Sequence, residues 1–140
     1  MRSMLFAFAI ASPFILGACQ TVASGEGHDL AQSVEGRVWH AEAIAGRDVV
    51  DGSTVTLKIE GGRVSGKAGC NGYGGPVEIH GDRVKFGAIF STKMACLSNG
   101  VMEQEQRYLN VLQSATRGEI RGDGVLIISG DGGALEFRPD

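Results

Sequence analysis

Short runs of alternating apolar and polar residues, separated by turn-forming pairs, limit the fold of this chain more than any other feature. In TVTLKIE (residues 54–60) every second side chain is apolar, which is the period of a half-buried β-strand. Gly61 and Gly62 follow, and glycine accepts the positive φ angles of a two-residue hairpin turn. The chain has 22 glycines and 3 prolines but no Gly-X-Y repeat, which fits many such turns. An antiparallel β domain is expected.

The same pattern recurs along the chain and predicts most of its strands. VWHAEAI (residues 38–44) is expected to be the first strand, with the only tryptophan, Trp39, as a core anchor. Three further hairpins are expected over residues 76–90, 119–129 and 128–137, each turning at a glycine next to an aspartate. The sum is seven or eight antiparallel strands.

One segment, residues 99–118, has the spacing of an amphipathic helix. Its apolar residues at helical spacing are Val101, Met102, Tyr108, Leu109, Leu112 and Ala115. Ser98 or Asn99 is expected to cap the helix and Gly118 to end it, while Glu103 and Glu105 suit the dipole at its start. The expected fold class is α+β and mostly antiparallel, a curved sheet or cracked barrel with this one helix.

The N-terminal segment, residues 1–18, has the layout of a secretory signal peptide. Arg2 precedes an almost wholly apolar run over residues 4–16, and small residues follow. Ser12 and Pro13 interrupt that run, which is shorter than the roughly 20 residues of a membrane-spanning helix. Cleavage is therefore expected rather than a retained transmembrane helix.

The stretch LGAC (residues 16–19) resembles the lipobox of bacterial lipoproteins, which implies that Cys19 is acylated and becomes the first residue of the mature chain. The alternative is an ordinary signal peptide cut after Ala18, with Cys19 as a spare thiol. Residues 19–35 are small and polar and are interpreted as a lipidated N-terminus and flexible tether, followed by the domain at 36–140. Gln20 after the cysteine favours the outer membrane, facing the periplasm.

Charge and motifs exclude several classes of function. The formal net charge is −3 and the basic residues are scattered singly, so nucleic acid is not an expected partner. The glycine-rich stretch at 66–75 lacks the Gly-x-x-x-x-Gly-Lys-Ser/Thr order of a phosphate loop. The histidines lack metal-ligand spacing, so no metal or other cofactor is expected. Cys96 with His40 or His80 is a conceivable nucleophile and base, and nothing in the sequence brings them together.

Two cysteines, Cys70 and Cys96, remain once Cys19 is assigned to lipid. The signal peptide sends the chain to an oxidising compartment, where two thiols suit one structural disulfide. The alternatives are two buried free thiols and a redox-active pair. The structural disulfide is the favoured interpretation.

Four blocks carry a resemblance to a known family: Trp39 in the first strand, GKAGCNGYGG at 66–75, TKMAC at 92–96, and MEQEQRYLNVL at 102–112. With them the sequence resembles the META domain family, also called HslJ-like, of small bacterial heat-shock and envelope proteins. The resemblance implies a curved sheet or cracked barrel with a helix against it and a cysteine pair at Cys70 and Cys96. It implies no established catalytic activity, and it links the chain only in general terms to stress response, antibiotic tolerance, motility or secretion.

The expected function is non-enzymatic binding by a lipid-anchored envelope protein, in stress response or maintenance. The motif residues Asn71, Tyr73, Thr92 and Met94 are the candidates for recognition, although a packed ring is favoured for Tyr73. The expected partners are the membrane, through the lipid, and an envelope protein. The alternatives are a carrier of a small apolar or lipid ligand and a thiol redox enzyme.

Overall fold

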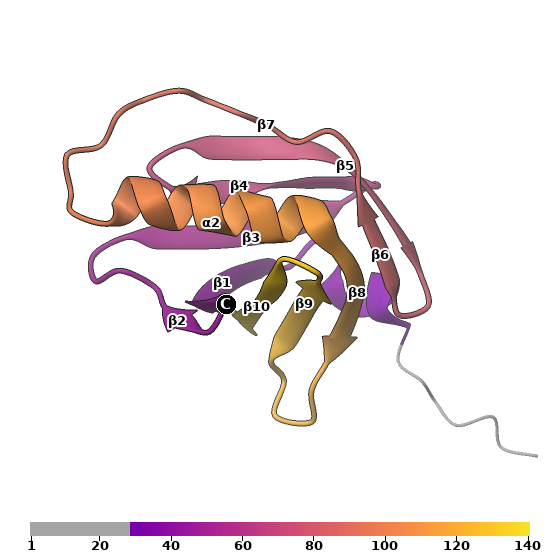
Figure 1. Ribbon diagram of the computed structural model, residues 1–140. Coiled ribbons are helices and arrows are strands. Elements are labelled where there is room, and N and C mark those ends of the chain that lie inside the picture. The colour runs from indigo at the N-terminus through magenta and orange to yellow at the C-terminus, as the bar shows by residue number, and fades with distance from the viewer. Residues whose placement is uncertain (1–28) are drawn as a thin grey trace, which may run out of the picture.

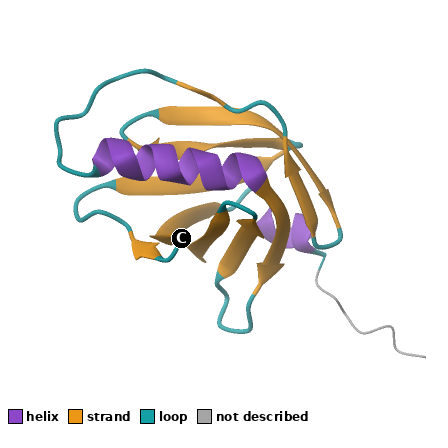
Figure 2. Ribbon diagram, viewed as in Figure 1, coloured by secondary structure: helices purple, strands orange, loops and turns teal. Residues whose placement is uncertain are grey.

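The computed structural model describes residues 29–140, which form ten strands and two helices (Figures 1 and 2). In chain order these are α1 Leu30–Val34, β1 Val38–Ile44, β2 Arg47–Asp48, β3 Thr54–Glu60, β4 Arg63–Gly69, β5 Gly72–His80, β6 Arg83–Phe86, β7 Phe90–Ser91, α2 Val101–Ser114, β8 Ala115–Ile120, β9 Leu126–Gly130 and β10 Gly133–Pro139. The predicted signal peptide and Cys19 lie outside the described residues. None of the helices in residues 29–140 is both long and apolar enough to span a membrane.

Eight of the strands form a closed antiparallel barrel. The order is β1-β3-β4-β5-β6-β8-β9-β10, and β10 pairs back with β1, placing Trp39 opposite Pro139 and Ile44 opposite Leu135. The two-residue strands β2 and β7 pair with β1 and β5 outside this order. The predicted α+β, mostly antiparallel fold is confirmed, and the sheet closes fully, which removes its exposed edges.

Alternate side chains of these strands fill the barrel. Val55, Leu57 and Ile59 of β3 are all buried, as their period-two spacing predicts. Trp39 is 1% exposed and is the predicted core anchor, although its indole Nε1 has no hydrogen-bond partner among the described residues. The largest of the fully buried side chains are Trp39, Tyr108, Phe137, Ile44, Leu57, Leu112, Leu126, Ile128 and Leu135.

Helix α2 lies across the barrel, as Figure 1 shows, and its ends differ from those predicted. It begins after Gly100, whose φ is +79°, and no side chain caps it, so Ser98 and Asn99 are not caps. It ends at Ser114, and Gly118 belongs to strand β8 instead of ending the helix. This segment was expected to continue the helix, but it pairs with β9, with Gly118 opposite Ile128. The pairing makes it a strand in spite of its helical spacing.

A short helix, α1, replaces the last part of the predicted tether. Asp29 caps it by accepting a hydrogen bond from the Ala31 backbone N–H at 3.2 Å. Leu30 and Val34 are buried in the core, and a Cβ on Gly118 would lie 2.8 Å from Leu30 Cδ2. The domain therefore begins before Gly36, because two apolar residues of the tether complete its core.

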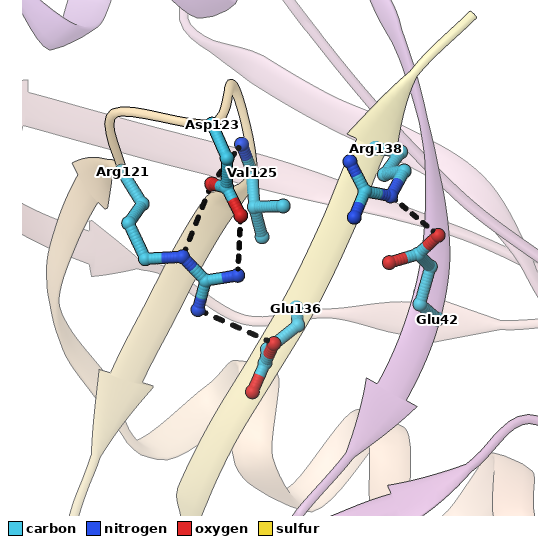
Figure 3. Close-up of polar contacts among 6 residues, drawn as sticks. All are labelled: Glu42, Arg121, Asp123, Val125, Glu136 and Arg138. Atoms are coloured by element: carbon cyan, nitrogen blue, oxygen red, sulfur yellow. Dashed lines mark hydrogen bonds and ion pairs between the residues drawn. The ribbon is translucent and has the colours of Figure 1, made fainter.

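Ion pairs cover the outer face of the barrel near the β1–β10 seam (Figure 3). Arg138 on β10 donates to Glu42 on β1 at 2.7 Å, and Arg121 lies 3.7 Å from Glu136. Arg121 also forms two hydrogen bonds with Asp123, at 3.1 and 2.9 Å. These side chains are about half exposed, so salt screens the pairs and they add little to stability.

The Arg121 guanidinium lowers the pKa of Asp123 to about 2. A lowered pKa stabilises the folded state above the unfolded pKa of about 3.9, and this contribution is lost as the pH falls through 2. In an NMR titration of the folded protein, we expect the Asp123 carboxyl midpoint near pH 2 and a midpoint near its ordinary value in Arg121→Ala. Arg138→Ala is the matched control and leaves the midpoint unchanged. A wild-type midpoint near 4 would contradict the pairing.

Candidate functional site

The glycine-rich stretch provides the surface on which a long connection lies. This connection, residues 87–100, which we call the crossing loop, joins β6 to α2 and includes β7. Phe90 lies opposite Gly74 of β5, and a Cβ on Gly74 would approach the Phe90 ring to 3.0 Å. A Cβ on Gly75 would lie 2.7 Å from the Ala88 carbonyl oxygen. The glycines of β5 are therefore required for the close approach of this loop.

A disulfide joins the crossing loop to the end of β4. Cys70, at the bend between β4 and β5, is bonded to Cys96, with a Cα–Cα distance of 5.9 Å. Cys70 is 8% exposed and Cys96 is half-buried. The predicted disulfide is present in the structure, and it fixes the loop four residues before Gly100.

The Asn71 side chain holds the crossing loop with all of its hydrogen-bonding capacity. Its Nδ2 donates to the Met94 carbonyl at 3.1 Å and to Glu105 Oε1 at 2.6 Å. Its Oδ1 accepts from the Thr92 hydroxyl at 2.8 Å and from the Met94 N–H at 2.7 Å. Both donors and both lone pairs of the amide are used, so its orientation is fixed. Three of the predicted motif residues, Asn71, Thr92 and Met94, thus meet in one network.

Glu105 of α2 is the buried centre of this network, and the sequence interpretation of it was wrong. Its Oε2 accepts from the backbone N–H of Asn71 at 2.7 Å and from that of Cys70 at 3.1 Å, and its Oε1 accepts from Asn71 Nδ2. The side chain is buried, and no ion pair involving it exists within residues 29–140. Three N–H donors therefore offset its desolvation. Glu103, by contrast, is exposed and does behave as a charge at the helix start.

Gln104 is a second residue that sequence reasoning missed. It is fully buried, accepts from the Val50 N–H at 2.6 Å and donates to the Ser53 hydroxyl at 2.9 Å. Gln104 and Glu105 both lie on the buried stripe of α2, whose members are Val101, Gln104, Glu105, Tyr108, Val111 and Leu112. The sequence did contain a signal for these two buried residues, because both are polar and lie on the apolar stripe of the helix.

Tyr73 is a packed ring, as favoured from the sequence. Its hydroxyl donates to the Thr56 carbonyl at 2.8 Å and so accepts from the Tyr108 hydroxyl, 2.6 Å away. The two rings meet edge to face at 5.4 Å, which joins α2 to β5 inside the barrel. Burial raises the pKa of both phenols above their ordinary value.

The crossing loop exposes three large apolar side chains. Among residues 29–140 the large apolar side chains that are exposed are Phe90, Met94, Leu97 and Ile120, and three of these four lie in the loop. Leu97 is 98% exposed. Lys93 is the only charged residue of the loop. A buried polar network therefore supports an exposed apolar surface.

The other candidate residues lie elsewhere. His40 of β1 is 3.4 Å from Asp140, and His80 ends β5, far along that strand from the residues beside the disulfide. In the described part of the chain, no three His, Cys, Asp or Glu side chains are placed to hold a metal ion. An open groove of about 1110 Å³ lies between α1 and the β8–β9 hairpin, with Leu30, Trp39 and Ile120 among its lining residues.

Removing the disulfide is expected to destabilise the domain by about 3.5 kcal/mol, because the bond closes a loop of 26 residues. Urea denaturation of a Cys70→Ser, Cys96→Ser double variant measures this loss against the oxidised protein. Reduction of the wild type in mild reductant should reproduce it. Equal stability of the oxidised and reduced forms would show that the bond does not constrain this chain.

The protein is a small antiparallel barrel that is crossed by one long helix. A cysteine pair lies beside the hydrogen-bonded Asn71 and Glu105, and together these features define its structural class. The META domain profile matches residues 32–140, and the chain belongs to the META domain family. The suspected family is confirmed, and its match also begins inside α1. In general terms this membership supports a stress-related protein of the envelope type.

Two solved structures are similar in fold. One is the NMR structure of a protein from Burkholderia xenovorans, 23% identical, with a TM-score of 0.64 over 100% of this chain and 99% of that chain. The other is an NMR structure of a protein that is 15% identical, with a TM-score of 0.64 over 76% of this chain and 92% of that chain. A search of curated proteins finds no match.

Proposed function

We propose that this protein is a non-enzymatic, lipid-anchored protein of the cell envelope that acts by binding, in envelope stress response or maintenance. The observation that carries the proposal is the exposed apolar surface of the crossing loop, held from beneath by Asn71, Glu105 and the disulfide. Several large apolar side chains exposed on one segment of a small domain are typical of interaction sites.

The chemistry of the motif supports binding over catalysis. The Asn71 amide is saturated by internal hydrogen bonds, the buried Glu105 carboxylate accepts three hydrogen bonds from within the chain, and both cysteine sulfurs are in the disulfide. A nucleophile or general base has to reach a substrate with a free lone pair. The exposed side chains of the loop are instead apolar or uncharged polar groups, apart from the single cation Lys93.

The anchor is proposed at Cys19, with the domain on the periplasmic face of the outer membrane. More than one acyl chain makes attachment effectively stable, since each buried methylene contributes about 0.8 kcal/mol. Cell fractionation after labelling with a palmitate analogue tests this proposal. We expect labelled wild type in the membrane fraction and unlabelled Cys19→Ser outside it, with the Cys70→Ser, Cys96→Ser variant still labelled. An unlabelled wild-type protein would contradict the proposed lipid anchor.

The role in stress is tested in a strain that lacks the protein. Wild type is expected to restore growth under heat or detergent stress, and Cys19→Ser to restore less, since it is not held at the membrane. A strain without any envelope phenotype, or full rescue by Cys19→Ser, would argue against an anchored function.

The groove beside α1 supports one second candidate, a carrier of a small apolar or lipid ligand. Large side chains fill the barrel interior, so such a ligand would bind in an outer groove, and this one has Leu30, Trp39 and Ile120 in its lining. Trp39, the only tryptophan, lies beside it and reports on occupancy. Native mass spectrometry of the protein taken from its host should show a co-purified mass, lost in Ile120→Asp. Bare protein with unchanged Trp39 fluorescence on adding fatty acid would exclude the carrier.

A further inference from the structure

Two of the three asparagines of the chain are followed directly by glycine. They are Asn71, before Gly72, and Asn99, before Gly100, whereas Asn110 lies within α2. In such a pair the backbone nitrogen of the glycine can attack the side-chain amide of the asparagine, because glycine has no Cβ to obstruct the approach and adopts φ angles closed to other residues. The chain therefore contains the same reactive pair twice, in two different surroundings.

The fold protects Asn71 from this reaction. Its side chain is 1% exposed, and its amide makes four hydrogen bonds, to Glu105, to Thr92 and twice to Met94. The Gly72 nitrogen could reach the amide carbon only if the amide turned away from these partners, which would leave buried donors and acceptors unpaired. The network that holds the crossing loop thus also keeps this asparagine intact.

The side chain of Asn99 has no such restraint. Asn99 is exposed, and the asparagine side chains that form hydrogen bonds within residues 29–140 are those of Asn71 and Asn110. It also lies beyond Cys96, the last residue at which the crossing loop is bonded to the end of β4. The amide of Asn99 is therefore free to turn towards the next backbone nitrogen.

That nitrogen, of Gly100, is available as the attacking atom. The turn at this point is closed by a hydrogen bond from the Val101 N–H to the Ser98 carbonyl, at 3.3 Å. The Gly100 N–H lies inside the turn and donates to no acceptor in the part of the chain that the structure describes. Its φ of +79° lies in the left-handed region, where glycine is unstrained. Both reacting groups are thus exposed and unbonded.

We propose that Asn99 is a site of spontaneous deamidation in the folded protein, and that Asn71 is not. The Gly100 nitrogen attacks Asn99 Cγ, a new C–N bond forms and the bond from Cγ to its NH₂ group breaks. Ammonia leaves with the proton of the Gly100 nitrogen, and a cyclic succinimide remains. Water then opens this ring at either carbonyl, which gives aspartate or isoaspartate. The net reaction consumes one water, releases one ammonia and involves no oxidation or reduction.

The product changes the crossing loop where it joins α2. Lys93 is the only charged residue of the loop, so the new carboxylate cancels the loop's formal charge. Helix α2 begins after Gly100 without a side-chain cap, so a carboxylate at position 99 interacts favourably with the helix dipole and the aspartate form is expected to keep the fold. Isoaspartate adds one carbon to the backbone between Cys96 and the helix. This inference goes beyond the proposed function and does not depend on the anchor or on any partner.

Incubation of the folded, oxidised protein in mildly alkaline buffer tests the proposal, with a reduced sample in urea as the unfolded reference. Trypsin then releases the two Asn-Gly pairs in separate fragments, residues 68–83 and 94–107, and mass spectrometry measures the exchange of NH₂ for OH in each. In the folded protein we expect position 99 to react at least about tenfold faster than position 71, since breaking one or two buried hydrogen bonds is enough for such a difference. In urea the two rates should be similar.

Asn99→Gln is the matched variant, because it changes an exposed side chain that forms no hydrogen bond in residues 29–140 and leaves Asn71 in place. On isoelectric focusing, aged wild type should acquire a more acidic band that aged Asn99→Gln lacks and that fresh Asn99→Asp matches. An intact Asn99 in folded protein that reacts in urea would overturn the proposal, as would equal reaction of both asparagines in the folded state. The same tenfold preference in urea would show that local sequence, and not the fold, sets the difference.

Discussion

Glu105→Gln is expected to lower the free energy of unfolding by about 4 kcal/mol, because it breaks a buried charge-assisted network. Glu105 accepts three N–H hydrogen bonds, two of them from the backbone at Cys70 and Asn71. Glutamine keeps the shape but supplies one oxygen and an NH₂ group. At least one of the three N–H groups then faces another donor in a buried site.

Urea denaturation of the oxidised protein measures this loss. Glu103→Gln is the matched control, because it removes the same charge from an exposed position two residues earlier on α2, and we expect it to change stability by less than about 0.5 kcal/mol. If the two variants were equally stable, the buried carboxylate would not be what ties α2 to the crossing loop.

Alkaline unfolding is the second large effect, and it arises from the Tyr73–Tyr108 pair. Burial raises the pKa of both phenols, and these are the only 2 tyrosines of the chain. A raised folded-state pKa means that the contribution to stability is fully present below the unfolded pKa of about 10 and is lost as the pH rises. Above pH 10 the unfolded chain loses the two phenolic protons, whereas the folded chain keeps them. The free energy of unfolding then falls by about 2.7 kcal/mol per pH unit.

By pH 12 this loss reaches about 5 kcal/mol, which is the whole stability of many small domains. We therefore expect phenolate absorbance to remain absent at pH 11 and then to appear in one cooperative step together with the loss of the circular dichroism signal. In Tyr73→Phe the dependence on pH should be half as steep. A gradual phenolate titration centred at pH 10 in folded protein would show that the pair is accessible to solvent.

The strands were predictable because the sequence patterns that specify them, alternation and turn residues, are local. Alternation in residues 54–60 and a glycine pair at the turn fix β3 and its hairpin without reference to the rest of the chain. The end of α2 was not predictable in this way, because Ala115 continues the helical spacing and residues 115–118 become a strand only by pairing with β9.

The site was predictable in part. The resemblance implied the pair Cys70 and Cys96 and singled out Asn71, Thr92 and Met94 as candidates for recognition, whereas the structure shows that these three are bonded to one another. Glu105 was missed because an acidic residue near a helix start has an ordinary explanation in the helix dipole, and only its position on the buried stripe argues against it. The role of Leu30 and Val34 in the core was missed because five residues carry too little periodicity to predict α1.

The central claim is that the crossing loop is an ordered, exposed surface held by the Asn71–Glu105 network and the disulfide. Backbone ¹⁵N relaxation at Phe90, Met94 and Leu97 in the oxidised protein tests it most directly. We predict order parameters of about 0.85, as in the strands, falling in Glu105→Gln and on reduction. Order parameters below about 0.6 in the intact, oxidised protein would show a flexible loop and contradict the account.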